Sequence, residues 1–272
     1  MRRLSVLLLL LFPLASLFAR EDELPIADGE QIHYTVLYKC GFSADLADIT
    51  FYTEREEDDL FHSIIWIQSR QRWDSFFRVR DLYECRYKDN PEMDPYWFHR
   101  DVLEKNYKAK SWYQWEEDGS ISMVREKGDK PKQDTVFRDE RKIRDIVNTI
   151  YYLRLLDYEK CLAGEPCSIY SSFDFDLYHF TITRAVREKK KIEGKVYHTI
   201  RVNFEMQNLF VDTGTESDLV VSSDKEGKSR MTIWISDDDN KIPLYFQIGL
   251  RLGSIHGRLS MMKGNKYPLN VD

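Results

Sequence analysis

The feature that most constrains this chain is an alternation of apolar and polar residues that recurs along most of its length. The alternating segments are rich in β-branched and aromatic residues, which suit strands with one buried face. They are IHYTVLY, LFHSIIWIQ, SISMVRE, YHFTITRAV, VYHTIRVNFEM and RMTIWIS. Short turn signals separate them, and Asp118-Gly119 is the strongest. Strands joined by short turns need no crossover helix, so we expect an antiparallel meander.

One segment in the middle of the chain breaks this period. Within RKIRDIVNTIYYLRLLDYEK the apolar residues recur every three or four positions, which predicts a single helix of about three turns. Asp139 or Asp145 can cap its start, and Gly164 lies beyond its end. A flat meander of ten or more strands curls or closes. The sequence therefore predicts a mainly β fold: one large curved antiparallel sheet or incomplete β-barrel, with the helix packed on its concave face.

The N-terminus predicts export. Two arginines precede an unbroken apolar run from Val6 to Phe12, and Ala19 supplies a small residue for cleavage. This pattern is typical of a secretory signal peptide, and the run is too short to span a bilayer. We predict a signal peptide over residues 1–19 and a single β-rich exported domain over residues 20–272. The mature chain is expected to contain no transmembrane span and to reside in the periplasm or outside the cell.

The charge of the chain argues against one class of partner. The formal net charge is −6, and it becomes more negative once the two N-terminal arginines leave with the signal peptide. Nucleic-acid binding needs clustered Lys and Arg, so we predict no nucleic-acid partner. The densest basic run is REKKKIEGK. We interpret this run as the solvated turn of a hairpin.

Four cysteines remain in the mature chain: Cys40, Cys85, Cys161 and Cys167. An even number in an oxidising compartment permits two disulfides. The short loop CLAGEPC favours a bond between Cys161 and Cys167, and a bond between Cys40 and Cys85 then follows by elimination. All three connectivities remain open at this stage. No CxxC pair is present, so the cysteines do not form a zinc pattern.

Three consecutive carboxylates, Asp237 to Asp239, raise the question of a metal site. A calcium loop needs oxygen ligands spaced along a longer loop, usually with a Gly at its sharp bend. The segment DDDNKIP lacks both features, whereas Asp and Asn favour turns because their side chains bond the local backbone. We therefore interpret it as the polar tip of a hairpin. No HExxH or other metal spacing occurs, so we predict no metal and no cofactor.

Two further pairs of residues are candidates for catalysis. Ser254 and His256 in GSIHG share a strand face, which permits a hydrogen bond, but a triad also needs a third group and an oxyanion hole. Asp174 and Asp176 alternate with aromatic residues in FDFDLYHF. As a pair in a cleft they suit glycoside hydrolysis, whereas alternation predicts that they face solvent. We favour the solvent-facing interpretation and predict no catalytic residues.

Three segments together resemble an uncharacterised family of exported bacterial proteins, classed as a domain of unknown function. They are DGEQIHYTVLYKCGF, DIVNTIYYLR and IWISDDDNKIPLYFQIGLRLGSIHGRL. The resemblance covers almost the whole mature chain. It implies an architecture similar to the half-barrel of lipoprotein carriers, and the family offers no enzymatic residues to carry over.

The aromatic content, 14% of the chain, suffices for both a core and a pocket. If the helix faces the hollow of the sheet, a ligand would meet residues of the helix and of the tryptophan-rich segment. These candidates are Ile150, Tyr151, Arg154, Trp97, Trp112 and Trp115. Arg154 equally suits a structural salt bridge. Our first hypothesis is an envelope protein that binds an apolar or amphipathic ligand, such as a lipid, without catalysis. One alternative is a structural or interaction subunit with an envelope protein partner, and a carbohydrate-active enzyme is the least favoured.

Overall fold

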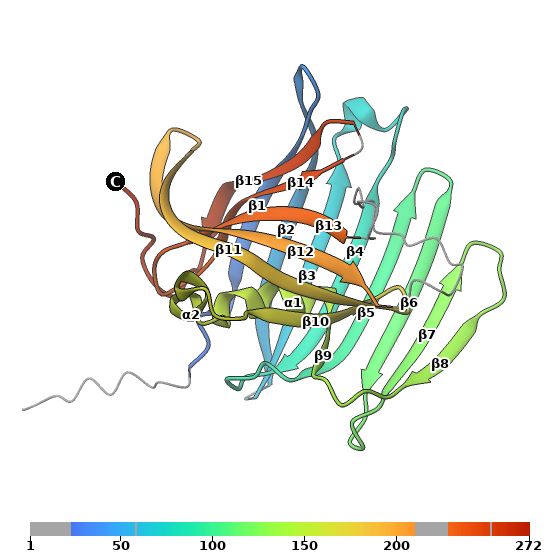
Figure 1. The fold of residues 1–272 in the computed structure, drawn as a ribbon. Coiled ribbons are helices and arrows are strands. Elements are labelled where there is room, and N and C mark those ends of the chain that lie inside the picture. The colour runs from blue at the N-terminus through green and yellow to red at the C-terminus, as the bar shows by residue number, and fades with distance from the viewer. Residues whose placement is uncertain (1–22, 58, 210–227, 251) are drawn as a thin grey trace, which may run out of the picture.

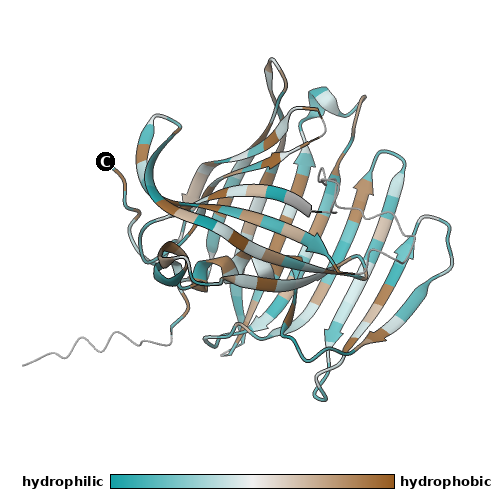
Figure 2. Cartoon of the chain, in the orientation of Figure 1, coloured by the Kyte–Doolittle hydropathy of each residue, from teal (hydrophilic) through white to brown (hydrophobic). Residues whose placement is uncertain are grey.

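The structure is a computed structural model that describes residues 23–57, 59–209, 228–250 and 252–272. The predicted signal peptide therefore lies outside the described residues. Figure 1 shows one continuous sheet that curls strongly, so that its two halves face each other across α1. Figure 2 shows the alternation of apolar and polar residues along the strands. None of the helices in the described residues has the length and apolar character needed to cross a membrane.

The strands form two groups, which make up the two halves of the sheet. The first group is β1 (Glu30–Lys39), β2 (Ser43–Glu57), β3 (Leu60–Ser69), β4 (Arg80–Lys88), β5 (Pro95–Glu104), β6 (Tyr107–Trp115), β7 (Ile121–Lys127) and β8 (Gln133–Phe137). The second group is β9 (Ile143–Asp145), β10 (Ser168–Phe173), β11 (Asp176–Ile192), β12 (Lys195–Asn208), β13 (Lys228–Ser236), β14 (Pro243–Gly249) and β15 (Ser254–Lys263). A 3-10 turn, η1 (Gln71–Trp73), lies between β3 and β4.

The strand order joins these groups at the middle of the sheet. It runs β8-β7-β6-β5-β4-β3-β2-β1-β15-β14-β13-β12-β11-β10-β9, so β1 pairs with β15 and the edges are β8 and β9. Each neighbouring pair is antiparallel except β9 with β10. At the seam, Thr35 pairs with Arg258 and Leu37 pairs with His256. The sheet stays open because β8 and β9 do not pair, and the predicted curved antiparallel sheet is confirmed.

The helical region is more broken than the predicted single helix of three turns. It consists of α1 (Ile146–Tyr152), the 3-10 turn η2 (Leu153–Leu155) and α2 (Tyr158–Ala163). Asp145 caps α1, since its side chain accepts a hydrogen bond from the backbone N–H of Asn148 at 2.8 Å. Leu156 has extended backbone and ends the first stretch, and Gly164, with φ of 83°, ends the second. The one sizeable helical segment is therefore α1 with η2, and it packs on the concave face.

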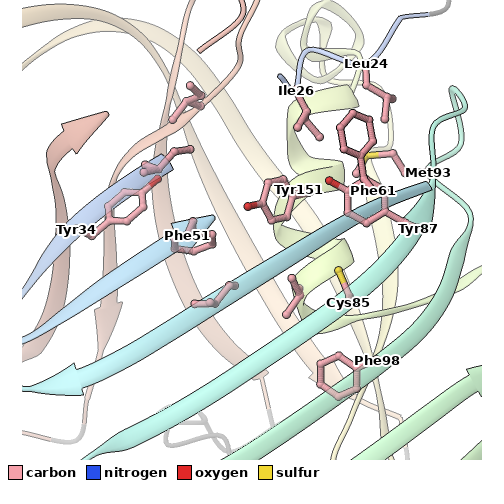
Figure 3. Packing of buried hydrophobic residues seen from close by; sticks show 14 of the residues in the cluster. Leu24, Ile26, Tyr34, Phe51, Phe61, Cys85, Tyr87, Met93, Phe98 and Tyr151 are labelled. Atoms are coloured by element: carbon pink, nitrogen blue, oxygen red, sulfur yellow. The ribbon is translucent and has the colours of Figure 1, made fainter. Parts of the chain in front are cut away.

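A buried chain of hydroxyl groups fixes α1 to the first half of the sheet. The Thr53 hydroxyl donates to the Tyr151 hydroxyl at 2.7 Å. Ser63 lies 2.8 Å from Thr53 and 3.0 Å from the hydroxyl of Tyr87. Figure 3 shows Tyr151 among the aromatic core residues of β2 and β4, including Phe51 and Tyr87. The face of α1 that carries Tyr151 is thus held by β2, β3 and β4.

The turn between β10 and β11 joins the two halves of the sheet. Asp174 and Phe175 form this turn with positive φ values of 53° and 71°. Arg100 on β5 donates to the Asp174 carboxylate at 2.9 Å, and Arg125 on β7 donates to the Asp174 carbonyl at 2.8 Å. Lys127 also pairs with this carboxylate. The prediction that Asp174 and Asp176 face solvent is therefore wrong: both are buried, because the turn inserts into the opposing wall.

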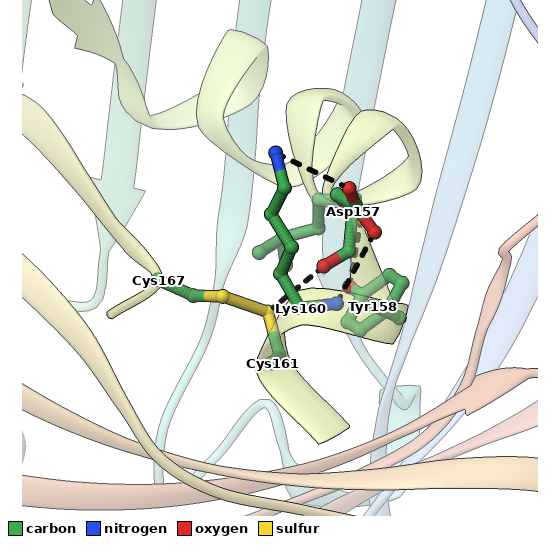
Figure 4. Close-up of a disulfide and its surroundings, with 6 residues drawn as sticks. Asp157, Tyr158, Lys160, Cys161 and Cys167 are labelled. Carbon is green, nitrogen blue, oxygen red and sulfur yellow. Dashed lines mark hydrogen bonds and ion pairs between the residues drawn. A yellow bond between two sulfur atoms is a disulfide. The ribbon is translucent and has the colours of Figure 1, made fainter. Parts of the chain in front are cut away.

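The cysteines follow the prediction in one pair only. Cys161 and Cys167 form a disulfide with a Cα–Cα distance of 5.9 Å, which ties α2 to the start of β10 (Figure 4). Cys40 and Cys85 are both free, so the bond predicted by elimination is wrong. Cys85 lies level with Glu30 across β3 and β2, whereas Cys40 follows the far end of β1. Ten residues of strand, about 30 Å, therefore separate the two cysteines, and a disulfide needs Cα atoms within about 7 Å.

Candidate functional site

An apolar cavity of about 350 Å³ lies between α1 and the concave face of the curled sheet. Strands from both halves of the sheet form its walls, and the helical segment forms its base. The wall from β1 to β4 contributes Tyr34, Ile49, Phe51, Ile65, Ile67 and Tyr83. The wall from β10 to β14 contributes Ile169, Phe173, Phe180, Phe204, Met206, Arg230, Met231, Ile233, Pro243, Phe246 and Ile248. The base consists of Ile146, Val147, Thr149, Ile150 and Leu153.

The strand period accounts for this lining. In a strand, every second side chain points to the same face. Ile65 and Ile67 of β3 line the cavity, while Trp66 between them is 42% exposed on the other face. The curl of the sheet then brings the apolar faces of two distant groups of strands around one helix. The cavity remains where the helix is too narrow to fill the space between the walls.

The hydroxyl groups around the cavity are engaged within the protein. The Tyr34 hydroxyl donates to the Pro243 carbonyl at 2.5 Å, and burial raises the pKa of this phenol far above its ordinary value. The Thr149 hydroxyl lies 2.8 Å from the Asp145 carbonyl and 2.9 Å from Ser171 Oγ. The charged lining residue is Arg230, whose side chain is 76% exposed and lies 3.6 Å from Glu205. The site is therefore apolar inside, with one cation at its solvent-exposed margin.

The helical candidates from the sequence fall at different depths. Ile150 lines the cavity. Tyr151 points away from it, into the hydroxyl chain of the core. Arg154 does not line the cavity: it is buried, pairs with the carboxylate of Glu30 and donates to the Asn240 carbonyl at 2.9 Å. The helix thus serves as a plug on the Tyr151 side and as a cavity wall on the Ile150 side.

The three tryptophan candidates lie away from the cavity. Trp97 and Trp112 lie on the outer face of β5 and β6, where each ring packs against His99. Trp115 lies on the inner face, and its indole N–H donates to the Ile143 carbonyl at 3.1 Å. The aromatic residues that do line the cavity come from both halves of the chain, such as Phe51 on β2 and Phe204 on β12.

Ser254 and His256 do form the hydrogen bond that their spacing permits. Ser254 Oγ lies 2.7 Å from His256 Nε2, and the Tyr245 hydroxyl lies 2.7 Å from His256 Nδ1. Burial, followed by the positive charges of Lys39 and Lys190, lowers the pKa of His256 to about 4. A general base must accept a proton in the reaction, and this environment opposes the imidazolium ion. The arrangement therefore disfavours nucleophilic catalysis.

The acidic segment between β13 and β14 is a hydrogen-bonded turn. The Asp238 carboxylate accepts hydrogen bonds from the Ser236 hydroxyl at 2.8 Å and from the Asn240 backbone N–H at 2.9 Å. It also accepts one from the Asn270 backbone N–H at 3.0 Å. Within the part of the chain that the structure describes, no group of three or more His, Cys, Asp or Glu is arranged to hold a metal ion.

Fold and cavity together define an open, β-barrel-like protein with an apolar interior. The crystal structure of a β-barrel-like protein of the domain of unknown function DUF1849 from Brucella abortus is similar to it, with a TM-score of 0.53 and 8% identity over 89% of this chain and 99% of that chain. Residues 32–260 match the family model of DUF3108, described as a protein of unknown function, and the chain belongs to this family.

A second solved structure, a protein with a YmcC-like fold from Bacteroides fragilis, matches with a TM-score of 0.36 and 7% identity over 89% of this chain and 98% of that chain. The comparison with curated proteins finds no match. The likeness to the Brucella protein supports the open barrel-like fold that the sequence predicts. At 8% identity it carries no information on what the cavity binds.

Proposed function

We propose that this protein binds the apolar part of an amphipathic molecule, such as the acyl chain of a lipid, in the cavity beside α1, without chemical change. The observation that supports this proposal is the cavity itself. Its volume of about 350 Å³ falls within the roughly 300–1,000 Å³ that is usual for small-molecule sites. Protein interiors are otherwise packed as densely as organic crystals, and voids larger than a water molecule are few.

The lining also favours an apolar guest over a polar one. The hydroxyl groups of Tyr34 and Thr149 already bond to protein atoms, so a polar guest would lose its hydrogen bonds to water without replacement. An acyl chain gains about 0.8 kcal/mol for each methylene that it buries. Arg230 at the exposed margin is suitably placed for the polar end of such a molecule. The acyl chain would then lie along Ile150 and the facing strands.

The proposal includes export to the cell envelope. It rests on the signal-like sequence of residues 1–19 and on the disulfide between Cys161 and Cys167, since disulfides persist in oxidising compartments. A lipid or another amphipathic molecule is the partner expected there.

The test is a substitution that fills the cavity. Ile150→Trp adds a large apolar side chain to the base of the cavity. Ile64→Trp is the control: it makes the same exchange on β3, where Ile64 points to the outer face while the adjacent Ile65 lines the cavity. Protein purified from the cell envelope is extracted and its lipid content is measured by mass spectrometry. Binding of a fluorescent fatty-acid probe is titrated in parallel.

We expect bound lipid and saturable probe binding in the unmodified protein and in Ile64→Trp, and a loss of both in Ile150→Trp. Circular dichroism checks that all three proteins are folded. Absence of lipid and of probe binding in the unmodified protein would contradict the proposal. It would favour a structural or interaction subunit whose interior is filled by its own side chains.

A further inference from the structure

The basic run REKKKIEGK forms the exposed tip of a hairpin, as predicted, and its turn is Glu193-Gly194. Figure 1 shows that the long β11–β12 hairpin curls at its end. There the Lys190 ammonium lies 3.8 Å from the centroid of the Trp234 ring and 4.4 Å from that of Tyr245. The Trp234 indole donates to the Glu188 carboxylate at 2.7 Å. The tip therefore folds back over the outer face of β13 and β14, with Lys190 facing the sheet while the turn itself stays exposed.

A second cavity, of about 300 Å³, lies under this folded tip. This cavity is on the outer face of the sheet. Leu37 pairs with His256 and Tyr245 pairs with Trp234, whereas Phe246, the neighbour of Tyr245, points to the inner face and lines the apolar cavity. Its charged and polar lining consists of Lys39, Lys190, Lys191, Glu193, Tyr245 and Arg258. Four cations from three strands therefore meet around one space, with a single carboxylate among them.

The positive charge of this cavity is compensated only in part. Glu193 lies 2.8 Å from Arg258, which also approaches Asp45 at 4.0 Å. Both carboxylates therefore form ion pairs with the arginine and not with the lysines. Across the described ranges, no carboxylate lies within 4.0 Å of the ammonium group of Lys39, Lys190 or Lys191. Three lysines thus gather at one hollow of a chain whose net charge is −6, and the Glu188 carboxylate near Lys190 offsets only part of their charge.

This concentration of charge affects the groups around it. Burial is the largest cause that lowers the pKa of Lys190; the Glu188 carboxylate opposes this, and the positive charge of Lys39 lowers the pKa further. The same two lysines lower the pKa of His256, which lies beside Tyr245. A concave surface with charges of one sign focuses the electrostatic field and attracts ions of the opposite sign. An anion in the cavity would relieve the repulsion between the lysines.

We propose that the cavity under the β11–β12 tip is a binding site for a phosphate group. Ammonium groups are strong donors to phosphate oxygens, and the guanidinium of Arg258 offers further donors. A space of about 300 Å³ admits a phosphate together with part of the molecule that carries it. The phosphate is either free or the head group of an anionic lipid, and both present the same oxygens to the lysines. This site is separate from the apolar cavity and does not depend on the function proposed for it.

The test removes one of the lysines. Inorganic phosphate is titrated into the full chain by isothermal titration calorimetry at low and at high salt. Sedimentation with vesicles of phosphatidylcholine, with and without phosphatidic acid, gives the second arm. Lys190→Gln removes the half-buried charge at the centre of the site, and Lys39→Gln removes one at its margin. Lys108→Gln, an exposed lysine on β6, is the matched control for loss of one positive charge.

We expect phosphate binding that weakens with salt and that falls about 10-fold to 100-fold in Lys190→Gln, as for loss of one charged hydrogen bond. Lys39→Gln is expected to weaken it as well, and Lys108→Gln to leave it unchanged. Binding only to vesicles that contain phosphatidic acid, with the same dependence on Lys190, assigns the phosphate to a lipid head group. Binding of neither probe, or equal effects of Lys190→Gln and Lys108→Gln, would overturn the proposal.

Discussion

The carboxylate of Asp174 provides the sharpest test of how the two halves of the sheet are held together. Its side chain is 2% exposed, and those of its partners Arg100, Arg125 and Lys127 are 1%, 8% and 16% exposed. Asp174→Asn removes the negative charge and keeps nearly the same side-chain volume. Asn also tolerates the positive φ of this position better than most residues. The substitution therefore isolates the electrostatic contribution.

The magnitude follows from the burial of the partners. In Asp174→Asn, the Arg100 guanidinium remains inside the protein and loses its ion pair with the Asp174 carboxylate. Breaking a buried ion pair from one side destabilises a protein by about 3–5 kcal/mol. Whole domains are stable by only about 5–15 kcal/mol. We therefore expect a lower denaturation midpoint, with the β10–β11 turn released from β5 and β7.

Urea denaturation followed by tryptophan fluorescence measures the change, with Asp176→Asn as the control. Asp176 is buried two residues further on. Burial raises the pKa of its carboxyl, which means that the surroundings disfavour the ionised form. A neutral amide at position 176 is expected to change the unfolding free energy by about 1 kcal/mol or less. The reasoning is refuted if Asp174→Asn costs no more than Asp176→Asn. In a further variant, Arg100→Met combined with Asp174→Asn is expected to recover part of the loss.

Four further outcomes are expected. Neither Cys161 nor Cys167 should accept a thiol label in denatured protein without reductant, and replacing both by Ser should cost about 2 kcal/mol of unfolding free energy; labelling of both would rule out the bond. Ile150→Ala, at a cavity wall, should cost less than the roughly 2–5 kcal/mol typical of a packed core and should reduce lipid content; a larger loss with no lipid in either protein would mean that the helix is only a plug. Burial raises the pKa of Asp145 to about 7, above its ordinary value near 4, so the native state loses this residue's contribution as pH rises through that window; Asp145→Asn should gain stability relative to the unmodified protein between about pH 4 and 7, and urea titrations that show a constant difference would contradict this. N-terminal sequencing of protein from the cell envelope should begin close to Arg20, and a start at Met1 would defeat the predicted cleavage.

Local periodicity in the sequence predicted part of the elements of this fold: the six named stretches lie in β1, β3, β7, β11, β12 and β13, while the predicted single helix is divided into α1, η2 and α2. Period-two stretches became strands, and the one segment of helical spacing begins with α1, capped by Asp145. The curl and the order of the strands were not accessible in this way, because they depend on which distant strands pair. The missing register also explains the error for Cys40 and Cys85, since elimination among cysteines carries no information on distance along a strand.

The candidate site was predictable only in part. The spacing that placed Ile150 on the helix stripe also placed Tyr151 there, and only the packed structure separates the cavity side from the core side. Trp97 precedes the buried Phe98, and Trp112 precedes the buried Tyr113, so strand alternation puts both tryptophans on the outer face of the sheet. Asp174 escaped prediction because two residues with positive φ make a turn there, so strand alternation does not apply across it.

The pairing of β1 with β15 sets an order for folding. The neighbours of β2 to β8 lie close in sequence, so this half can form as soon as it is synthesised. The seam, in contrast, joins residues more than 200 positions apart, as in the pairing of Tyr34 with Leu259. Contacts of such long range form slowly because loop closure precedes any gain from them. Until β15 is available, β1 presents an unpaired edge, the kind of surface on which chains aggregate. A chain shortened before β15 would keep most of its strands and still lack the central contact that makes them one sheet.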